Sequence, residues 1–233
     1  MGVTRRKVNA RILGALWSVC TLSLAGSAQP ARAQSSQAEK PIRIVAFGDS
    51  LTAGYQLPPD AAFPVVLEKA LRARGFAVEV INAGVSGDTT AAGLERLAWA
   101  VPPDVDAVIL ELGANDALRG LDPGAARKNL AIIIETIKAQ KTDILFTGMI
   151  APRSFGDAYT KPFDAMYPEL AKQYGLLFYP FFPKATALQP KLSLPDGLHP
   201  NAQGVAAIVA DILPVMEELI ARVKLRRTQA AKG

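Results

Sequence analysis

Short apolar runs alternate along the chain with longer segments in which apolar positions recur three and four residues apart. The short runs are rich in Val and Ile, which favours strands, and the longer segments have the spacing of amphipathic helices. The pattern predicts strands at 42–47, 78–82, 107–112, 144–150 and 176–179, and helices at 63–74, 89–100, 125–140, 161–174 and 202–223.

Strands that alternate with helices predict an α/β protein, in which a parallel sheet of about five strands lies between two layers of helices. The strands are apolar at nearly every position, as expected for strands that are buried on both faces. Ligands of open parallel sheets bind outside the carboxyl ends of the strands. The irregular stretches at 151–160 and 180–200 are long enough that we expect them to carry functional residues or a lid.

The first 33 residues have the layout of a secretory signal peptide. A basic start at Arg5, Arg6 and Lys7 precedes an apolar run at 12–25, and the small residues of a cleavage site follow at 31–33. The apolar run is too short to span a bilayer, so a membrane anchor is the less favoured alternative. We expect a cleaved signal, export to the periplasm or the medium, and no stable membrane insertion after cleavage. Beyond the signal we expect a lead-in at 34–40, one domain at 41–225 and a polar, basic tail at 226–233.

Removal of the signal changes the charge of the chain. The chain has 26 Lys and Arg against 21 Asp and Glu, but five of the basic residues and none of the acidic ones lie in residues 1–33. The remaining chain is therefore neutral, which argues against a nucleic-acid partner. The only cysteine, Cys20, leaves with the signal, so we expect no disulfide and no thiol nucleophile. One histidine and no cysteine leave few ligands for a metal, and no G-x-G-x-x-G follows the first strand, so we expect no metal and no cofactor.

Polar residues at the predicted strand ends suggest acyl-transfer chemistry. His199 is the only histidine, so any acid–base chemistry by an imidazole depends on it. Ser50 follows the first strand and is the candidate nucleophile, and Asp196 can orient the imidazole and stabilise its charged form. Each residue also has a structural interpretation, because Ser50 can cap a helix and a single histidine is often structural. Asp49 is expected to be structural, as a cap or a brace for the serine turn.

Acyl transfer also needs donors for a developing oxyanion. The backbone N–H groups of Ser50 and Gly84 and the side-chain amide of Asn115 are the candidates, because they follow the first, second and third strands. Gly84 lacks a Cβ and lets a substrate approach the backbone closely. Gly84 and Asn115 can equally be turn and cap residues.

Four sequence blocks resemble those of the SGNH hydrolases, also called GDSL esterases/lipases. The name-giving residues of that family fall on Ser50, Gly84, Asn115 and His199 in the family's order, and the resemblance extends over about 42–220. It implies a serine hydrolase with a flavodoxin-like three-layer fold, without metal or cofactor. Residues 151–152 and 163–171 further resemble the branch of periplasmic arylesterases and thioesterase I/lysophospholipase. The four blocks are 48–55, 82–89, 111–120 and 196–200.

The expected substrate is a small-molecule or lipid ester, with a preference for short- to medium-chain acyl groups. Acyl thioesters and lysophospholipids are further candidates that the resemblance implies. Arg119 can meet a phosphate or carboxylate on the leaving group, or it can pair with Asp116 or Asp122. The residues expected to bind substrate are Leu118, Arg119, Tyr159 and Leu198, and Ile150, Leu121, Phe155 and Phe182 are further candidates for the wall of an acyl groove.

Two other functions remain open at this point. A carbohydrate O-deacetylase can use the same fold and the same triad, although the chain has few aromatic platforms for sugar. A non-catalytic flavodoxin-like binding module would need a degenerate site, and Ser50, Asp196 and His199 are all present. We expect the mature protein to be a monomer or a weak homo-oligomer.

Overall fold

The computed structural model describes residues 40–232, which belong to a compact unit that spans 38–233. The predicted signal peptide and nearly all of the lead-in lie outside the described residues, so both remain predictions. None of the helices within 40–232 has the length and apolarity that a membrane span requires.

Five parallel strands form one sheet in the order β2-β1-β3-β4-β5, which confirms the predicted strand number and fold class. The last residue of β1, Gly48, pairs with Gly84 of β2 and with Glu111 of β3, so three strands end on one line. The strand order reverses between β1 and β3, and ligands of such sheets bind outside the strand ends at this point. The strands are β1 (Ile42–Gly48), β2 (Val78–Gly84), β3 (Ala107–Glu111), β4 (Asp143–Thr147) and β5 (Leu177–Tyr179).

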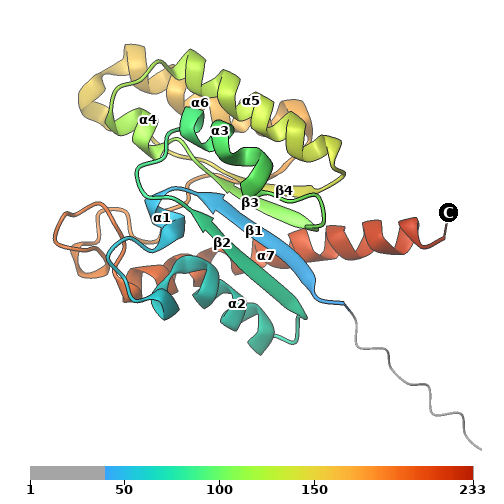
Figure 1. Cartoon of the computed structure of the whole chain (residues 1–233). Coiled ribbons are helices and arrows are strands. Elements are labelled where there is room, and N and C mark those ends of the chain that lie inside the picture. Colours follow the sequence, from blue (N-terminus) through green and yellow to red (C-terminus); the bar gives the residue numbers. More distant parts are fainter. Residues whose placement is uncertain (1–39, 233) are drawn as a thin grey trace, which may run out of the picture. The chain divides into compact units, whose positions relative to one another are not determined.

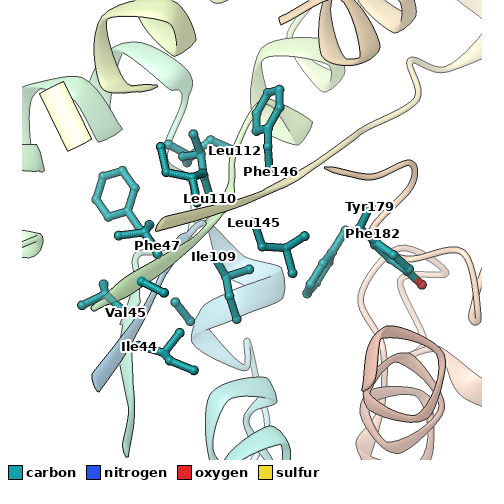
Figure 2. Packing of buried hydrophobic residues seen from close by; sticks show 14 of the residues in the cluster. Ile44, Val45, Phe47, Ile109, Leu110, Leu112, Leu145, Phe146, Tyr179 and Phe182 are labelled. Carbon is teal, nitrogen blue, oxygen red and sulfur yellow. The ribbon is translucent and has the colours of Figure 1, made fainter. Parts of the chain in front are cut away.

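The core lies on both faces of the sheet. Every residue of β3 is buried, and β1 is buried except for Arg43. Because side chains alternate along a strand, Phe47, Leu110 and Phe146 lie on one face, whereas Ile109 and Leu145 lie on the other (Figure 2). Burial on both faces explains why most positions of the central strands are apolar in the sequence.

Helices cover the sheet on both sides (Figure 1). Helices α3, α5 and α6 pack together over one face, and α2 and α7 pack together over the other. Side-chain caps fix where several of them start, as at Asp122, which accepts from the N–H groups of Gly124 and Ala125. The helices are α1 (Ser50–Ala53), α2 (Phe63–Ala73), α3 (Thr90–Ala100), α4 (Ala114–Leu118), α5 (Pro123–Ala139), α6 (Asp157–Tyr174) and α7 (Ala202–Ala230), with 3₁₀ turns at Pro59–Ala61, Arg153–Phe155 and Pro190–Leu192.

The last helix differs from the sequence-based expectation. We expected it to end at Val223, before a polar tail from residue 226, but α7 continues to Ala230. Arg226 pairs with Asp143 at 2.9 Å, and Arg227 pairs with Asp106 at 2.6 Å. Arg227 also donates to the carbonyl of Lys40, just ahead of β1, at 2.8 Å. The basic residues continue the helix because two carboxylates face them, those of Asp106, just ahead of β3, and of Asp143, the first residue of β4.

The fourth strand is shorter than expected. It was predicted to run to Ile150 but ends at Thr147. Gly148 still donates to the carbonyl of Tyr179 at 2.8 Å, and a Cβ at Gly148 would lie only 2.2 Å from the carbonyl oxygen of Pro180. At this close contact with the chain beyond β5, residues 149–152 leave the sheet at the carboxyl end of β4.

Candidate active site

Ser50 lies at the point where β1 passes into α1. Asp49 is the N-cap of this short helix, and its carboxylate accepts from the N–H of Leu51 at 3.0 Å. Gly48 is required because a Cβ at this position would lie 2.4 Å from the buried carboxylate of Glu111. The chain therefore turns within two residues and leaves the Ser50 hydroxyl at the edge of the sheet. This placement agrees with the structural role expected for Asp49.

The imidazole of His199 joins the Ser50 hydroxyl to Asp196. Nε2 lies 2.8 Å from Ser50 Oγ, and Nδ1 lies 2.7 Å from Asp196 Oδ2. Asp196 Oδ1 accepts from the N–H groups of Leu198 and His199 at 2.9 and 3.0 Å. These hydrogen bonds, with that of the His199 N–H foremost, lower the pKa of Asp196 to about 2. The carboxylate is thus ionised near neutral pH and can stabilise an imidazolium.

A closed loop ahead of α7 holds both Asp196 and His199. The N–H of Leu194 donates to the carbonyl of His199 at 2.7 Å and closes the loop. Asn201 caps α7 by accepting from the N–H of Gly204 at 3.0 Å, and its amide donates to the carbonyl of Lys191 at 2.9 Å. The start of α7 is therefore bonded to this loop, and the loop in turn orients the imidazole of His199 toward Ser50.

Asn115 lies on α4, directly after β3, and its side chain points to the same edge. Its Nδ2 donates to the carbonyl of Asp88 at 2.9 Å and to Oδ2 of Asp49 at 3.2 Å. The amide is thereby tied to the turn after β2 and to the cap that precedes Ser50. Both hydrogens of the amide are engaged in these bonds, so donation to an anion would require release of one of them, of which the bond to Asp49 is the longer.

Gly84 does not fit the role of oxyanion donor that its sequence position suggested. Its N–H donates to the side-chain oxygen of Asn82 at 3.0 Å. A Cβ at Gly84 would lie 2.3 Å from the backbone nitrogen of Ala53. The lack of a side chain at Gly84 is therefore needed where β2 packs against the end of α1, and its N–H is already engaged.

Gly87, in the same turn, has the free donor that Gly84 lacks. Its φ of +90° lies in the region that favours glycine, and a Cβ there would meet only the guanidinium of Arg119 at 3.7 Å. Within residues 40–232, the N–H groups of Ser50 and Gly87 donate to no other residue. The next residue, Asp88, accepts from Asn115, which places this turn beside the amide.

A buried arginine ties the turn after β2 to the end of β1. Arg96 of α3 pairs with Asp88 at 2.5 Å, and both side chains are about nine-tenths buried. The same guanidinium donates to the carbonyls of Gly48 and Ala83, each at 2.9 Å, and lies 4.3 Å above the ring of Phe47. Arg96 therefore holds the two strand ends that precede Ser50 and the turn of Gly87.

A second buried group, Glu111, lies against the turn that carries Ser50. Its Oε2 accepts from the Thr52 hydroxyl at 2.7 Å and from the N–H of Asp49 at 3.2 Å. Burial, reinforced by the carboxyl group of Asp49, raises the pKa of Glu111 well above its usual range. Burial likewise raises the pKa of Asp49, to about 6. Glu111 therefore supports the turn that presents Ser50 through the two hydrogen bonds that its Oε2 accepts.

An apolar pocket of about 210 Å³ opens next to Ser50 and His199. Leu118 and Leu198, both of which we expect to bind substrate, line this pocket, and each is almost half exposed at its mouth. Among the further candidates, Ile150 lines the pocket, whereas Phe182 is fully buried and packs on Phe63 instead. The remaining lining includes Asn115, Met149, Pro152, Phe181 and Pro183.

The structure does not bring the other two predicted substrate contacts to this pocket. The guanidinium of Arg119 donates to the carbonyl of Gly87 at 2.8 Å. Tyr159 donates to the carbonyl of Asp116 at 3.2 Å and stacks on Phe163. Neither residue lines the pocket beside Ser50. Both were assigned from sequence proximity, but their side chains brace the loops around the site.

Besides Gly87, sequence reasoning missed Arg96, Glu111 and Tyr55. The sequence placed Arg96 in a predicted helix and Glu111 in a predicted strand and nothing more, because a charged residue within a helix or strand does not show in the sequence whether it is buried. Tyr55 was only part of a sequence block, yet its ring lies against that of His199. Within residues 40–232, no three acidic, histidine or cysteine side chains gather as ligands for a metal ion.

Comparisons with known proteins agree with this geometry. Residues 46–207 match the model of the GDSL-like Lipase/Acylhydrolase family. The chain is similar to an arylesterase of Vibrio mimicus, with 37% identity over 183 residues, which cover 77% of this chain and 90% of that protein. It is also similar to thioesterase 1/protease 1/lysophospholipase L1 of Escherichia coli K12, with 36% identity over 68% of this chain and 75% of that protein.

Solved structures of esterases are also similar to this chain. AlinE4, an esterase of the SGNH-hydrolase family, superimposes with a TM-score of 0.65 at 45% identity over 77% of this chain and 96% of that chain. TesA superimposes with a TM-score of 0.72 at 30% identity over 76% of this chain and 99% of that chain. The family match extends over more than half of the sequence and includes all four strand-end blocks. This chain belongs to the GDSL-like lipase/acylhydrolase family.

Proposed function

We propose that this protein hydrolyses carboxylic esters with Ser50 as nucleophile, His199 as general base and Asp196 as the group that orients the base. Membership of the family makes the chain a hydrolase of esters, and the roles of individual residues are our proposal. The observation that carries it is the hydrogen-bonded chain Ser50–His199–Asp196, with distances of 2.8 and 2.7 Å, beside an apolar pocket.

In this mechanism Ser50 Oγ attacks the ester carbonyl while its proton passes to Nε2 of His199. The tetrahedral intermediate collapses, the imidazolium returns the proton to the leaving alcohol, and an acyl-enzyme remains. Water then attacks the acyl-enzyme while one of its protons passes to Nε2 of His199. The second tetrahedral intermediate collapses, Ser50 Oγ takes the proton back, and the carboxylic acid is released. Asp196 keeps Nδ1 protonated, so that Nε2 is free to accept.

The proposed oxyanion donors are the N–H of Ser50, the N–H of Gly87 and the amide of Asn115. The two backbone groups have no acceptor among the described residues. Asn115 lies next to them, and release of its bond to Asp49, which is 3.2 Å long, would free one N–H for the oxyanion. Gly87 replaces Gly84 in this role because the N–H of Gly84 is already bound to Asn82. A single donor of this kind typically contributes about 3 kcal/mol to the lowering of the barrier.

We propose that the acyl chain occupies the pocket between Leu118, Leu198 and Ile150. Its apolar walls and open mouth favour short- to medium-chain acyl groups with an aryl or alkyl leaving group outside. The names of the relatives, arylesterase and thioesterase 1/protease 1/lysophospholipase L1, extend the proposal to acyl thioesters and lysophospholipids.

The test is hydrolysis of p-nitrophenyl esters with acyl chains of two to sixteen carbons by residues 34–233. Ser50→Ala should lower turnover by roughly four to six orders of magnitude, because the nucleophile is lost. Ser154→Ala, at an exposed serine that does not line the pocket, should leave turnover unchanged. Activity that survives Ser50→Ala would refute the triad, and activity confined to acetylated sugars would favour an O-deacetylase.

We further propose that residues 1–33 are removed on export and that the mature chain is a monomer or a weak homo-oligomer without membrane insertion. N-terminal sequencing of the exported protein should begin at Gln34. Size-exclusion chromatography with light scattering should give the mass of a monomer at low concentration. An uncut N-terminus in the membrane fraction would refute the export proposal.

A further inference from the structure

The ring of Tyr55 covers one face of the His199 imidazole. The two ring centroids are 4.5 Å apart, and the ring planes are inclined by 37°. The Tyr55 hydroxyl makes no hydrogen bond with any residue of the described chain, and the side chain is partly exposed. The contact with His199 is therefore made by the aromatic face and not by the phenol oxygen.

The turn that presents Ser50 also fixes Tyr55. Helix α1 ends at Gly54, whose φ of +80° reverses the chain, and a Cβ there would lie 2.7 Å from Cβ of Ala62. The N–H of Tyr55 then donates to the carbonyl of Ser50 at 3.2 Å. One short segment thus places the nucleophile at Nε2 of His199 and an aromatic ring against the same imidazole.

The chemistry of the proposed function creates a cation at this place. His199 becomes an imidazolium each time it holds the proton of Ser50 or of the attacking water. The face of an aromatic ring carries negative charge density and attracts a cation within about 6 Å of its centroid. The other ionisable groups that face His199 are Asp196, at Nδ1, and Asp49, whose buried carboxyl interacts with the imidazole through its charge.

We propose that Tyr55 is a positioning residue that stabilises the protonated form of His199 through its aromatic face and keeps the imidazole aligned with Ser50. This inference rests on the proposed role of His199 as general base. Because the inference assigns the function to the aromatic ring, a substitution that keeps the ring should leave the protonation of His199 unchanged. A substitution that removes the ring should make the imidazole harder to protonate.

The test compares Tyr55→Phe, which keeps the ring, with Tyr55→Leu, which keeps an apolar side chain without a π face. Because His199 is the only histidine in the sequence, its ring protons can be followed by NMR without assignment. In Tyr55→Leu the midpoint of that titration should fall by about 0.5 pH unit, and kcat/KM at pH 7.5 should fall about three-fold. Tyr55→Phe should match the parent protein in both measurements.

The pH profile separates this role from a merely structural one. If the ring stabilises the imidazolium, the acid limb of kcat/KM moves to lower pH in Tyr55→Leu, so the deficit shrinks as the pH falls below 6. A structural defect would lower kcat/KM by the same factor at every pH and leave the NMR midpoint in place, which would overturn the proposal. An equal shift in Tyr55→Phe would also overturn it. The titration does not depend on activity, so its outcome is distinct from failure of Ser50→Ala to abolish hydrolysis.

Discussion

The buried ion pair between Arg96 and Asp88 supports the whole strand-end arrangement, and its removal is the most informative structural test. Arg96→Met keeps most of the side-chain volume but leaves the Asp88 carboxylate without its partner. It also removes the donors to the carbonyls of Gly48 and Ala83. The guanidinium and the carboxylate are each about nine-tenths buried, so water cannot replace the lost bonds without rearrangement.

The expected loss follows from this burial. Breaking a buried ion pair by removing one partner destabilises a protein by about 3–5 kcal/mol. For a domain of this size, 1 kcal/mol corresponds to about 2–4 °C in Tm, so Tm should fall by roughly 6–20 °C. Because the ends of β1 and β2 lose a shared anchor, kcat should also fall at temperatures where the variant is still folded.

The assay is urea unfolding followed by circular dichroism, with Arg222→Met as the control. Arg222 forms an exposed pair with Glu218 at 2.7 Å on α7, where removal should change the free energy of unfolding by less than about 0.5 kcal/mol. Asp88→Asn added to Arg96→Met should restore part of the stability, because the unpaired charge is removed. Equal losses for Arg96→Met and Arg222→Met would refute the reasoning.

Three further predictions concern single residues. Asp196→Asn should lower kcat by about two to four orders of magnitude with little change in KM, because Nδ1 of His199 loses its carboxylate; steady-state kinetics would contradict this if kcat were unchanged. Burial raises the pKa of Glu111, so this carboxyl ionises at a lower pH in the unfolded chain than in the native protein. The native protein should therefore lose stability relative to Glu111→Gln as the pH rises above 4.5. Urea unfolding at pH 5 and pH 8 should show this loss, and an equal difference in the free energy of unfolding at both pH values would contradict it. Gly84→Ala should destabilise the fold by about 1–3 kcal/mol and lower kcat, because the new methyl group displaces α1; thermal unfolding measures the first effect, and an unchanged Tm would argue against the close packing.

The fold was predictable because each element has a strong periodic signal. The strands are continuous apolar runs, and a parallel sheet buries such runs on both faces, so their order along the chain led to the correct architecture. The end of α7 was not predictable. Arg226 and Arg227 have the sequence of a solvated tail, and only the sheet brings Asp143 and Asp106 opposite them.

The site was predictable to the extent that strand ends converge on one edge. Ser50 and His199 are 149 positions apart, yet their side chains meet because each follows a strand of the same sheet. Side-chain direction could not be predicted. The choice between Gly84 and Gly87 depends on which N–H is already engaged by Asn82, and the exclusion of Arg119 from the pocket depends on the Gly87 carbonyl.

Arg227 has a consequence for where the domain can be shortened. Its guanidinium binds the carbonyls of Lys40 and Pro41 ahead of the first strand. The start of β1 and the last turns of α7 are thus joined by hydrogen bonds, although they lie at opposite ends of the domain in sequence. A chain cut before residue 226 would keep Ser50, Asp196 and His199 but would leave the start of β1 without these bonds, so both ends of the domain should lose stability together.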